Sequence, residues 1–308
     1  MLDIFTVAFG QMVVLFIFML LGYLLQRKKL APDTTGKSLS SLLVNIFLPA
    51  LNIKVFADNV TPAVLKDKAL LLVASCLILG VTFVLSPHLA KLFAKSPRQR
   101  EVFTYAFTIS NYGYLGYPLV EAVFGEEALF SMMVFCIPYN IAVYTWGIYI
   151  LNPNKEMHIQ KLLNPITVAM LVGILFGLTG ISLPAVCVNT LEAASACMAP
   201  CAMILTGFVL AKNPIREVLA APKMYLASLI RLVVLPAIAA FILCCLQTSD
   251  ELLMAAVMTL AMPMGLNNVV FPEAFGGDSM TGAQSCIISN LLGLVTIPLM
   301  VSLLSLLL

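Results

Sequence analysis

The chain of 308 residues is 61% hydrophobic and only 10% charged, with a formal net charge of +2 at pH 7. Soluble domains usually carry about 25% charged residues, so this composition excludes a soluble protein and indicates one that crosses a membrane several times. Because the few charges lie mostly in short segments between apolar runs, a nucleic-acid partner is not indicated.

Apolar runs long enough to cross a bilayer, roughly 17 to 25 residues, recur along the whole chain. The first run, residues 4–25, is followed by a basic segment and not by a small-residue cleavage site, so we interpret it as a span and not as a cleavable signal. The runs predict about ten spans, of which the second and seventh are interrupted by polar residues and proline. The spans begin near Ile4, Leu39, Ala69, Val102, Ala128, Pro165, Pro184, Tyr225, Leu252 and Ala283.

Basic residues gather in alternate loops, which predicts an orientation in the membrane. By the positive-inside rule, the loops at residues 27–37, 91–100, 155–161 and 212–223 face the cytoplasm. We therefore expect a multi-pass protein of the plasma membrane, with both termini outside. The loop at residues 276–278 is expected inside although it lacks a basic residue.

The two halves of the chain match one another at a shift of 151 residues. We therefore expect two five-helix repeats, residues 1–152 and 153–308. Because five is an odd number, the copies would lie in opposite orientations in the membrane, as in many secondary transporters. The matches are Gly22 with Gly173, Pro49 with Pro200, and Phe124-Gly125 with Phe275-Gly276.

The fourth span contains a sequence that is unusual for a continuous helix facing lipid. Residues 110–118 read Ser-Asn-Tyr-Gly-Tyr-Leu-Gly-Tyr-Pro in the middle of an apolar run. Two glycines, a proline and an asparagine predict a broken helix whose freed backbone groups meet protein, water or a ligand. At the shift of 151 residues, the ninth span has its own interruption at residues 263–268. Two such breaks are expected to cross near the bilayer midplane, where transporters bind their substrates.

Broken helices expose unpaired amides and the positive end of a half-helix dipole, which favour an anionic ligand such as a carboxylate. Asparagines can add donors, and tyrosines can add aromatic walls and hydroxyl groups. With two breaks in register, we favour this interpretation over kinks that only allow close helix packing. The candidate substrate-binding residues at the breaks are Asn111, Tyr112, Gly113, Tyr114, Gly116, Tyr117, Pro118, Pro263, Gly265, Asn267 and Asn268.

Polar residues outside the breaks are further candidates, each with a structural alternative. Asn45 and Asn52 of the second span could line the substrate path, or could belong to a kinked helix at a subunit contact. Arg231 of the eighth span could pair with a glutamate or an anionic substrate, but it is near enough to the cytoplasmic end to snorkel. Candidate charge-coupling residues also include Glu121, Glu192 and Glu273, which could instead be interfacial, and Gln284 and Ser289, which could instead hydrogen-bond between helices.

The sequence predicts no cofactor, no metal and no enzymatic site. The eight cysteines fall inside apolar runs without a CxxC pair, so we interpret them as small buried hydrophobic residues. The sequence offers no intramembrane histidine, paired aspartates, HExxH or GxSxG, so an intramembrane protease would lack both nucleophile and base. A passive channel is not excluded by the sequence, although paired breaks suit an occluded site better than a continuous pore.

Several motifs resemble those of the auxin efflux carrier family. They are Asn111-Tyr-Gly-Tyr-Leu-Gly-Tyr-Pro118, Arg231-Leu-Val-Val-Leu-Pro236, and Ala261-Met-Pro263 with Asn267. The family includes the plant PIN auxin exporters and bacterial permeases often described as carriers of malate or other carboxylates. The likeness covers the whole chain, from Leu48-Pro49-Ala50-Leu51 in the second span to Pro298 in the tenth.

The resemblance implies a scaffold made of spans one, two, six and seven, and a transport domain made of the other six around the crossed fourth and ninth helices. It also implies a homodimer that forms through the second and seventh helices of the scaffold. The connection between the halves, Asn152 to Asn164, is short, unlike that of the plant exporters. This difference favours a prokaryotic permease over an exporter of auxin itself.

We therefore expect a secondary carrier that moves an organic anion, a small carboxylate or an auxin-like acid, by alternating access. The alternative is a sodium-coupled organic-anion symporter of the bile-acid-symporter type. A second alternative is that transport is coupled to protons through one of the glutamates. The candidate sodium ligands are Asn267, Asn268, Gln284, Ser285 and Ser289.

Overall fold

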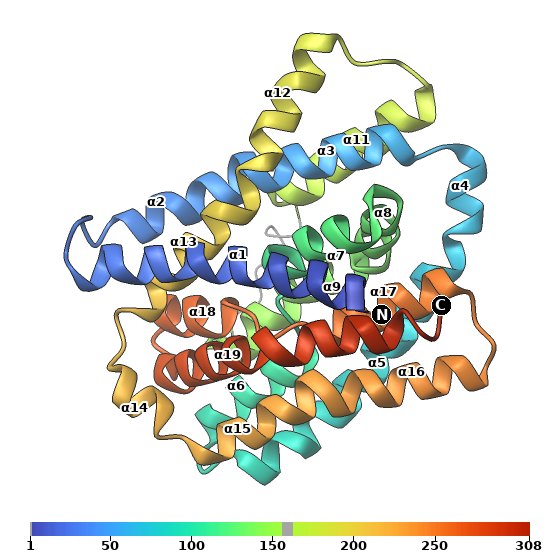
Figure 1. Cartoon of the computed structure of the whole chain (residues 1–308). Helices are drawn as coiled ribbons and strands as arrows, with labels where there is room; N and C mark the ends of the chain where they lie inside the picture. The colour runs from blue at the N-terminus through green and yellow to red at the C-terminus, as the bar shows by residue number, and fades with distance from the viewer. Residues whose placement is uncertain (1, 156–162) are drawn as a thin grey trace. The chain divides into compact units, whose positions relative to one another are not determined.

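The protein is helical throughout the part of the chain that the structure, a computed structural model, describes: residues 2–155 and 163–308 (Figure 1). Within these ranges, the β-structure is a single isolated bridge. The prediction of an all-helical chain is therefore confirmed. Part of the connection between the expected halves, residues 156–162, lies outside the described residues.

The helices follow one another with short connections. The first half contains α1 (Leu2–Arg27), α2 (Thr35–Leu42), η1 (Leu43–Phe47), α3 (Leu48–Asn59), α4 (Pro62–Asp67), α5 (Ala69–Phe93), α6 (Pro97–Thr108), η2 (Tyr112–Gly116), α7 (Tyr117–Phe124), α8 (Glu126–Phe135), α9 (Ile137–Ala142), η3 (Val143–Gly147) and α10 (Ile148–Leu151). The second half contains α11 (Pro165–Thr179), α12 (Ala185–Ala196), α13 (Met198–Leu210), α14 (Ile215–Leu219), α15 (Pro222–Leu229), η5 (Ile230–Val234), α16 (Leu235–Cys245), α17 (Asp250–Ala261), α18 (Asn267–Phe275) and α19 (Ser279–Leu304).

Six helices among the described residues are long and apolar enough to cross a membrane, and a bent pair made of α8 and α9–α10 would add a seventh. This number is lower than the ten or so spans expected from the apolar runs. Part of the difference arises because α11 has only 15 residues and because the expected fourth and ninth spans are interrupted. The six are Ile4–Arg27, Thr35–Asn59, Ala69–Phe93, Ala185–Leu210, Pro222–Cys245 and Ser279–Leu304.

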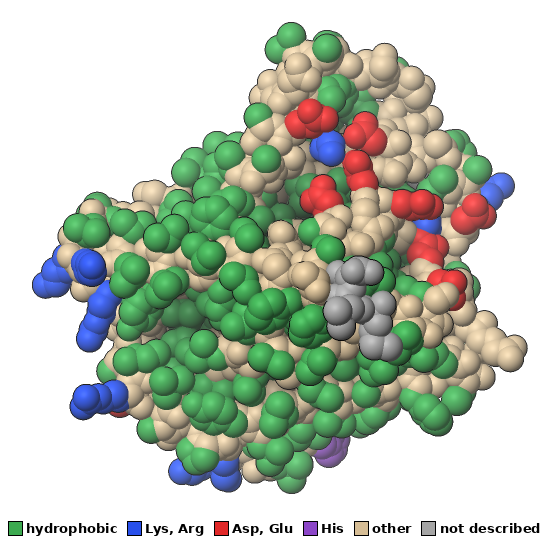
Figure 2. Space-filling model, in the orientation of Figure 1, with side chains coloured by type: hydrophobic (Ala, Val, Ile, Leu, Met, Phe, Trp, Pro, Cys, Tyr) green, Lys and Arg blue, Asp and Glu red, His purple; other side chains and the backbone are tan. Residues whose placement is uncertain are grey.

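Exposed apolar side chains cover much of the surface, and Figure 2 shows them over most of the visible face. On α5 they recur every three or four residues, which places them on one face of the helix. Such a face is expected where a helix contacts lipid and not water. The exposed large apolar residues of this helix include Leu70, Val73, Leu77, Val81 and Val84.

Among the described residues, the helices η1, η2, η3 and η5 are π-helical segments, in which the helix is widened by one residue. Three of them end two residues before a proline: Pro49 after η1, Pro118 after η2 and Pro236 after η5. A proline ring clashes with the carbonyl four residues earlier and donates no N–H. A widened turn relieves both conflicts, so these prolines explain where the helices deviate from regular geometry.

Internal contacts divide the chain into two compact units. Unit 1 comprises Met1–Val14, Leu71–His158 and Asn213–Leu308, and unit 2 comprises Leu15–Leu70 and Ile159–Lys212. Each unit therefore combines segments from both halves of the sequence.

Unit 2 contains two close approaches between backbones that the sequence repeat relates to one another. A Cβ added to Gly22 of α1 would lie 2.0 Å from the carbonyl oxygen of Ile204, and one added to Gly173 of α11 would lie 2.9 Å from that of Ile53. The shift of 151 residues relates Gly22 to Gly173 and Ile53 to Ile204, so the glycine and its contact residue come from opposite halves in the two pairs. The paired contacts support the interpretation of the chain as a repeat, and they use small residues as membrane helices commonly do.

Gly207 of α13 is expected to be intolerant of a side chain. Its added Cβ would lie 1.8 Å from the carbonyl oxygen of Met19 and 2.7 Å from the nitrogen of Tyr23. Gly207→Ala is therefore expected to lower the free energy of unfolding by about 1–3 kcal/mol or more, the usual cost of overpacking. Gly10→Ala in α1 is the matched control, because no described atom lies within 4 Å of a Cβ there. Thermal unfolding of the purified variants measures the difference, and equal melting temperatures would contradict this account of the packing.

The core of unit 1 surrounds α6. Phe93, Phe103 and Phe107 pack against one another, with ring centroids 5.7 to 6.4 Å apart. The same cluster includes Met264, from the segment between α17 and α18, and Ile288 of α19. This packing fixes the end of α6 against the interruption of the expected ninth span.

Candidate functional site

Both expected interruptions are present in unit 1. The first covers residues 109–111, between α6 and η2, and the second covers residues 262–266, between α17 and α18. We call these stretches the first break and the second break. In each, the α-helix stops within an apolar region. The chain resumes as the π-helical η2 after the first break and as the α-helix α18 after the second, so neither expected span is one continuous α-helix.

The two breaks are in direct contact through their backbones. Ser110 and Met264 form an isolated antiparallel β-bridge, and the Asn111 N–H donates to the Pro263 carbonyl oxygen at 2.8 Å. A Cβ on Gly265 would lie 3.4 Å from the Ser110 carbonyl oxygen, so the chains approach closely at this point. The pairing satisfies backbone groups that an apolar environment would otherwise leave unbonded.

The carbonyl ends of the helices that lead into the breaks are each bonded by a side chain. The hydroxyl of Ser110 donates to the Thr259 carbonyl oxygen of α17 at 2.6 Å. The Arg231 guanidinium donates through Nη1 to the Phe107 carbonyl oxygen of α6 at 3.2 Å. A cation at a helix C-terminus interacts favourably with the helix dipole, so Arg231 lies where α6 is most negative.

Arg231 is completely buried, with 0% exposure. It therefore does not snorkel to the cytoplasmic surface, which was one of the two interpretations open from the sequence. Among the described residues its hydrogen-bond partner is the Phe107 carbonyl, while Nε and Nη2 have none. Burying a charge costs several kcal/mol unless other groups compensate it, so a guanidinium with two unbonded nitrogens is suited to receive an anion.

Other buried polar groups of unit 1 also lack a hydrogen-bond partner among the described residues. They include the side-chain nitrogen of Asn111, the hydroxyl of Tyr139, and the side-chain oxygens of Asn268 and Asn290. Tyr139 lies close enough to Arg231 for an electrostatic interaction. The amide nitrogen and the hydroxyl can both donate to an oxyanion, as the free guanidinium nitrogens can.

An aromatic cluster lies beside the first break. The ring of Tyr112 packs edge-on against Tyr117 and Tyr139, with centroids 5.9 and 6.0 Å apart. Its hydroxyl donates to Asn140 Oδ1 at 2.8 Å. Tyr114, in the same π-helical segment, is partly buried. The tyrosines therefore form a wall in which the Tyr112 hydroxyl is already bonded to protein.

The glycines after the first break differ in their surroundings. A Cβ on Gly113 would have no described atom within 4 Å, whereas one on Gly116 would lie 3.0 Å from Met132 Cε and 3.1 Å from Met262 Cγ. Gly113 therefore borders open space, and Gly116 is packed. Pro118 is buried in the first turn of α7.

The tenth span supplies side chains that bond to the second break. The Met264 N–H donates to Ser289 Oγ at 3.0 Å, and the Asn268 amide donates to Ser285 Oγ at 3.0 Å. Ser289 therefore hydrogen-bonds to another segment of the chain, which was the alternative to a role in coupling. Asn267, at the start of α18, is partly buried.

Three candidates lie in unit 2, whereas both breaks lie in unit 1. The Asn45 amide donates to the Ser41 carbonyl and the Asn52 amide to the Leu48 carbonyl, each at 2.8 Å and within its own helix. Glu192 is exposed on α12.

Three further candidates belong to unit 1 but are not buried at the breaks. Glu121 on α7 and Glu273 on α18 are exposed. Gln284 is partly buried, and its amide donates to the Glu217 carbonyl oxygen at 3.2 Å. The exposed glutamates fit the alternative of interfacial residues, and Gln284 fits the alternative of a hydrogen bond between helices.

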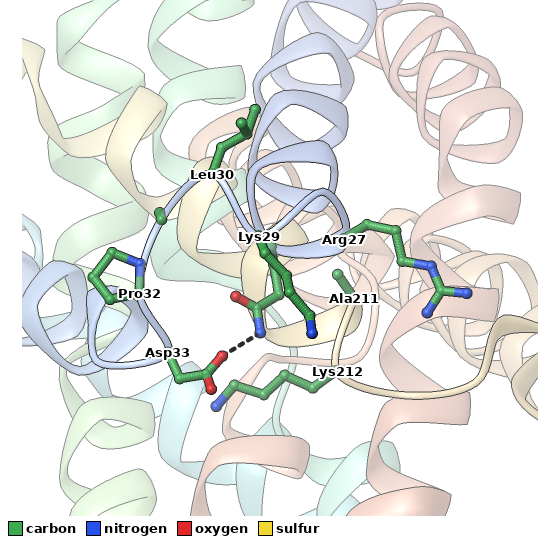
Figure 3. Close-up of a pocket in the computed structure, with 9 residues that line it drawn as sticks. Arg27, Lys29, Leu30, Pro32, Asp33, Ala211 and Lys212 are labelled. Carbon is green, nitrogen blue, oxygen red and sulfur yellow. Dashed lines mark hydrogen bonds between the residues drawn. The ribbon is translucent and has the colours of Figure 1, made fainter.

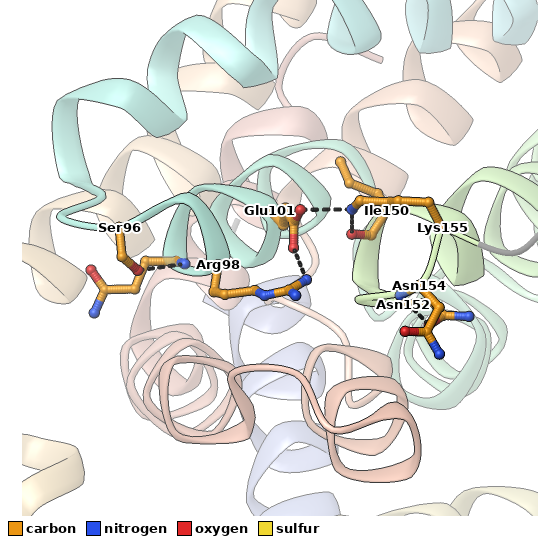
Figure 4. Close-up of polar contacts among 8 residues, drawn as sticks. Ser96, Arg98, Glu101, Ile150, Asn152, Asn154 and Lys155 are labelled. Carbon is orange, nitrogen blue, oxygen red and sulfur yellow. Dashed lines mark hydrogen bonds and ion pairs between the residues drawn. The ribbon is translucent and has the colours of Figure 1, made fainter.

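A basic hollow of about 570 Å³ lies at the other end of α6. Glu101 pairs there with Arg98 at 3.3 Å and with Lys155 at 2.7 Å, and Lys155 also donates to the Ile150 carbonyl oxygen at 2.7 Å (Figure 4). Glu101 was not among the predicted site residues, although it is the one acidic residue of the basic segment at residues 91–101. The basic lining residues are Lys91, Lys95, Arg100 and Lys155.

Comparison with known protein families gives a match over nearly the whole chain. The family model described as "Membrane transport protein" matches residues 7–161 and 154–301. The two matched segments overlap at residues 154–161, close to the expected boundary at residues 152–153, which is consistent with a repeat.

Two relatives align with this chain over nearly their whole length and a third over a part only, and all three are named as uncharacterized transporters. The chain is 22% identical over 307 residues to the uncharacterized transporter YfdV of Escherichia coli K12, covering 96% of both chains. It is 26% identical over 295 residues to an uncharacterized transporter of Methanothermobacter thermautotrophicus, covering 92% of this chain and 94% of that one. A shorter match, 34% over 102 residues, joins 33% of the chain to 23% of an uncharacterized transporter of Schizosaccharomyces pombe.

Proposed function

Because the chain belongs to the membrane transport protein family, the auxin efflux carrier family, we propose that it is a secondary carrier for a small organic anion. The family resemblance expected from the sequence is thereby confirmed. The protein is a multi-pass membrane transporter and not an enzyme. The class of substrate, a small carboxylate or an auxin-like acid, is our proposal from the site.

The buried guanidinium of Arg231 is the observation that carries this proposal. It bonds to the carbonyl oxygen of Phe107, three residues before the bridge residue Ser110, and two of its nitrogens have no described partner. The side-chain nitrogen of Asn111 and the hydroxyl of Tyr139 add donors that are buried and unbonded among the described residues. Donors and a fixed positive charge in a low-dielectric setting favour a carboxylate over a neutral or cationic substrate.

We further propose that unit 1, apart from Met1–Val14 of the first span, is the transport domain, and that unit 2 together with that segment is the scaffold against which it moves during alternating access. The division of the chain into these units supports the assignment, as does the presence of both breaks in unit 1. The arrangement would consist of ten spans in two inverted repeats, residues 1–152 and 153–308, with both termini outside. Movement of one packed unit against another is a common way for transporters to expose a site to either side.

A homodimer through the second and seventh spans belongs to the same proposal. No residue of α12 is buried in the part of the chain that the structure describes, and Val186 on this helix is 77% exposed. A second copy would cover this exposed helix. Mass measurement of the purified carrier in lipid nanodiscs tests the oligomeric state.

The alternative, a sodium-coupled symporter, is less well supported. Ser285 and Ser289, two of the five candidate sodium ligands, are engaged in hydrogen bonds to Asn268 and Met264. The permanent charge of Arg231 in the same unit also opposes a second cation. We therefore expect anion uptake by reconstituted vesicles to be the same in sodium and in potassium or choline buffers. Uptake that requires sodium would favour the symporter.

Asn111→Ala tests the proposed site directly. Loss of one hydrogen bond to a charged group typically costs about 1.5–3 kcal/mol, so we expect carboxylate affinity to fall roughly 10- to 150-fold. Asn45→Ala is the matched control, because Asn45 bonds to its own helix in unit 2. Uptake of labelled mono- and dicarboxylates into proteoliposomes measures both variants. If Asn111→Ala transports as the wild type does, Asn111 is not a substrate ligand.

A further inference from the structure

A second basic hollow, of about 650 Å³, lies in unit 2 where α1 ends (Figure 3). Its lining includes the cationic side chains of Arg27, Lys29 and Lys212 and the carboxylate of Asp33. The Gln26 amide donates to Asp33 Oδ1 at 2.8 Å and so ties the turn after α1 back to the helix. Three cations against one anion give the hollow a positive character.

The turn that carries Lys29 has an unusual backbone. Lys29 has φ = 54°, and the N–H groups of Lys29 and Leu30 donate to the carbonyls of Gln26 and Leu25, at 3.1 and 2.9 Å. This pair of hydrogen bonds is the Schellman arrangement, in which the left-handed position is usually glycine. Here the left-handed residue is instead a lysine that lines the hollow.

An exposed apolar stripe on α1 leads to the hollow. Its residues recur at spacings of three and four, so they lie on one face of the helix, and Arg27 continues the same spacing. Leu30, which is 70% exposed, adds an apolar side chain to the lining. The stripe within unit 2 consists of Ile17, Leu20, Leu21 and Leu24.

We propose that this hollow binds the head group of an anionic phospholipid, whose acyl chains lie along the stripe from Ile17 to Leu24. Basic pockets at the ends of membrane helices attract anionic head groups, and each Lys or Arg near the surface contributes to the attraction. A soluble phosphate would use the cations but not the stripe. The amphiphilic pattern therefore favours a lipid over a free anion.

The experiment compares lipid retention by the purified carrier in native mass spectrometry, with phosphatidylglycerol and phosphatidylcholine as probes. We expect phosphatidylglycerol to be retained preferentially by the wild type. The affinity of the double variant Arg27→Gln/Lys29→Asn for phosphatidylglycerol is expected to fall about 20- to 30-fold, because two surface cations are lost. Asparagine is chosen at position 29 because it tolerates the left-handed backbone. If the double variant does not fold, Lys29→Asn alone is expected to lose about fivefold.

Lys37→Gln is the matched control, since Lys37 is exposed on α2 in the same unit but does not line the hollow. It is expected to retain phosphatidylglycerol as the wild type does. Equal retention of the two lipids, or an equal loss in Lys37→Gln, would overturn the proposal. Displacement of the lipid by glycerol 3-phosphate at similar concentration would show a site for a soluble phosphate and would also overturn it.

Discussion

Arg231→Met is expected to abolish anion uptake while the melting temperature stays close to that of the wild type. Removing one partner of a buried charge pair costs about 3–5 kcal/mol, so substrate affinity should fall at least about 100-fold. Stability should change little, because methionine fills a similar volume and removes a charge whose burial is itself unfavourable. The lost bond to the Phe107 carbonyl, at 3.2 Å, acts in the opposite direction.

Two variants separate the charge of Arg231 from its shape. Arg231→Lys keeps a positive charge but loses the planar fork, so it is expected to retain part of the uptake. Lys223→Met makes the same change of charge on the same observed span, Pro222–Cys245, at an exposed position, and should transport as the wild type does. Uptake into proteoliposomes and thermal unfolding are measured for all three. Normal uptake by Arg231→Met would mean that the guanidinium only closes the end of α6.

The interruptions of the helices could be predicted from the sequence because the cause is local. Glycine, proline and asparagine within residues 110–118 disfavour a regular helix wherever the segment lies in the fold. The repeat predicted the second interruption at residues 263–268. The observed second break, residues 262–266, overlaps only part of this range. The shift of 151 residues also relates the Gly22 and Gly173 contacts, which no local pattern would have paired.

Arg231 shows why burial could not be predicted. Its place about six residues into an apolar run is compatible with either snorkelling or burial. The outcome depends on the packing of α17 and α19 against η5, which is a property of the tertiary structure. Its partner, the Phe107 carbonyl oxygen, is a backbone group and leaves no signal in the sequence.

The asparagines show a second limit of sequence patterns. Asn45 and Asn111 are both polar residues in apolar segments, yet the Asn45 amide bonds to the Ser41 carbonyl one turn earlier, while the Asn111 side-chain nitrogen lacks a described partner. A side chain in a continuous helix can use its own backbone, and one at a break has fewer such groups nearby. Composition alone therefore overestimates the number of polar residues available to a ligand.

Gly113→Trp is expected to reduce uptake below detection without unfolding the carrier, whereas Gly113→Ala should transport within about twofold of the wild type. A Cβ at this position meets no described atom within 4 Å, so both side chains extend into open space beside the first break and do not enter the packed core. The small methyl group leaves that space largely free. The indole would fill it and would hinder an anion from approaching Asn111.

Gly116→Ala provides the comparison for a packed glycine in the same segment. Its Cβ would lie 3.0 Å from Met132 Cε and 3.1 Å from Met262 Cγ, so these flexible side chains must shift, and the melting temperature is expected to fall slightly. The two glycines thus separate an effect on access from an effect on packing. Uptake and thermal unfolding of the three variants test this separation. If Gly113→Trp transports as Gly113→Ala does, the space beside the first break is not on the path of the substrate, and the proposed binding position is wrong.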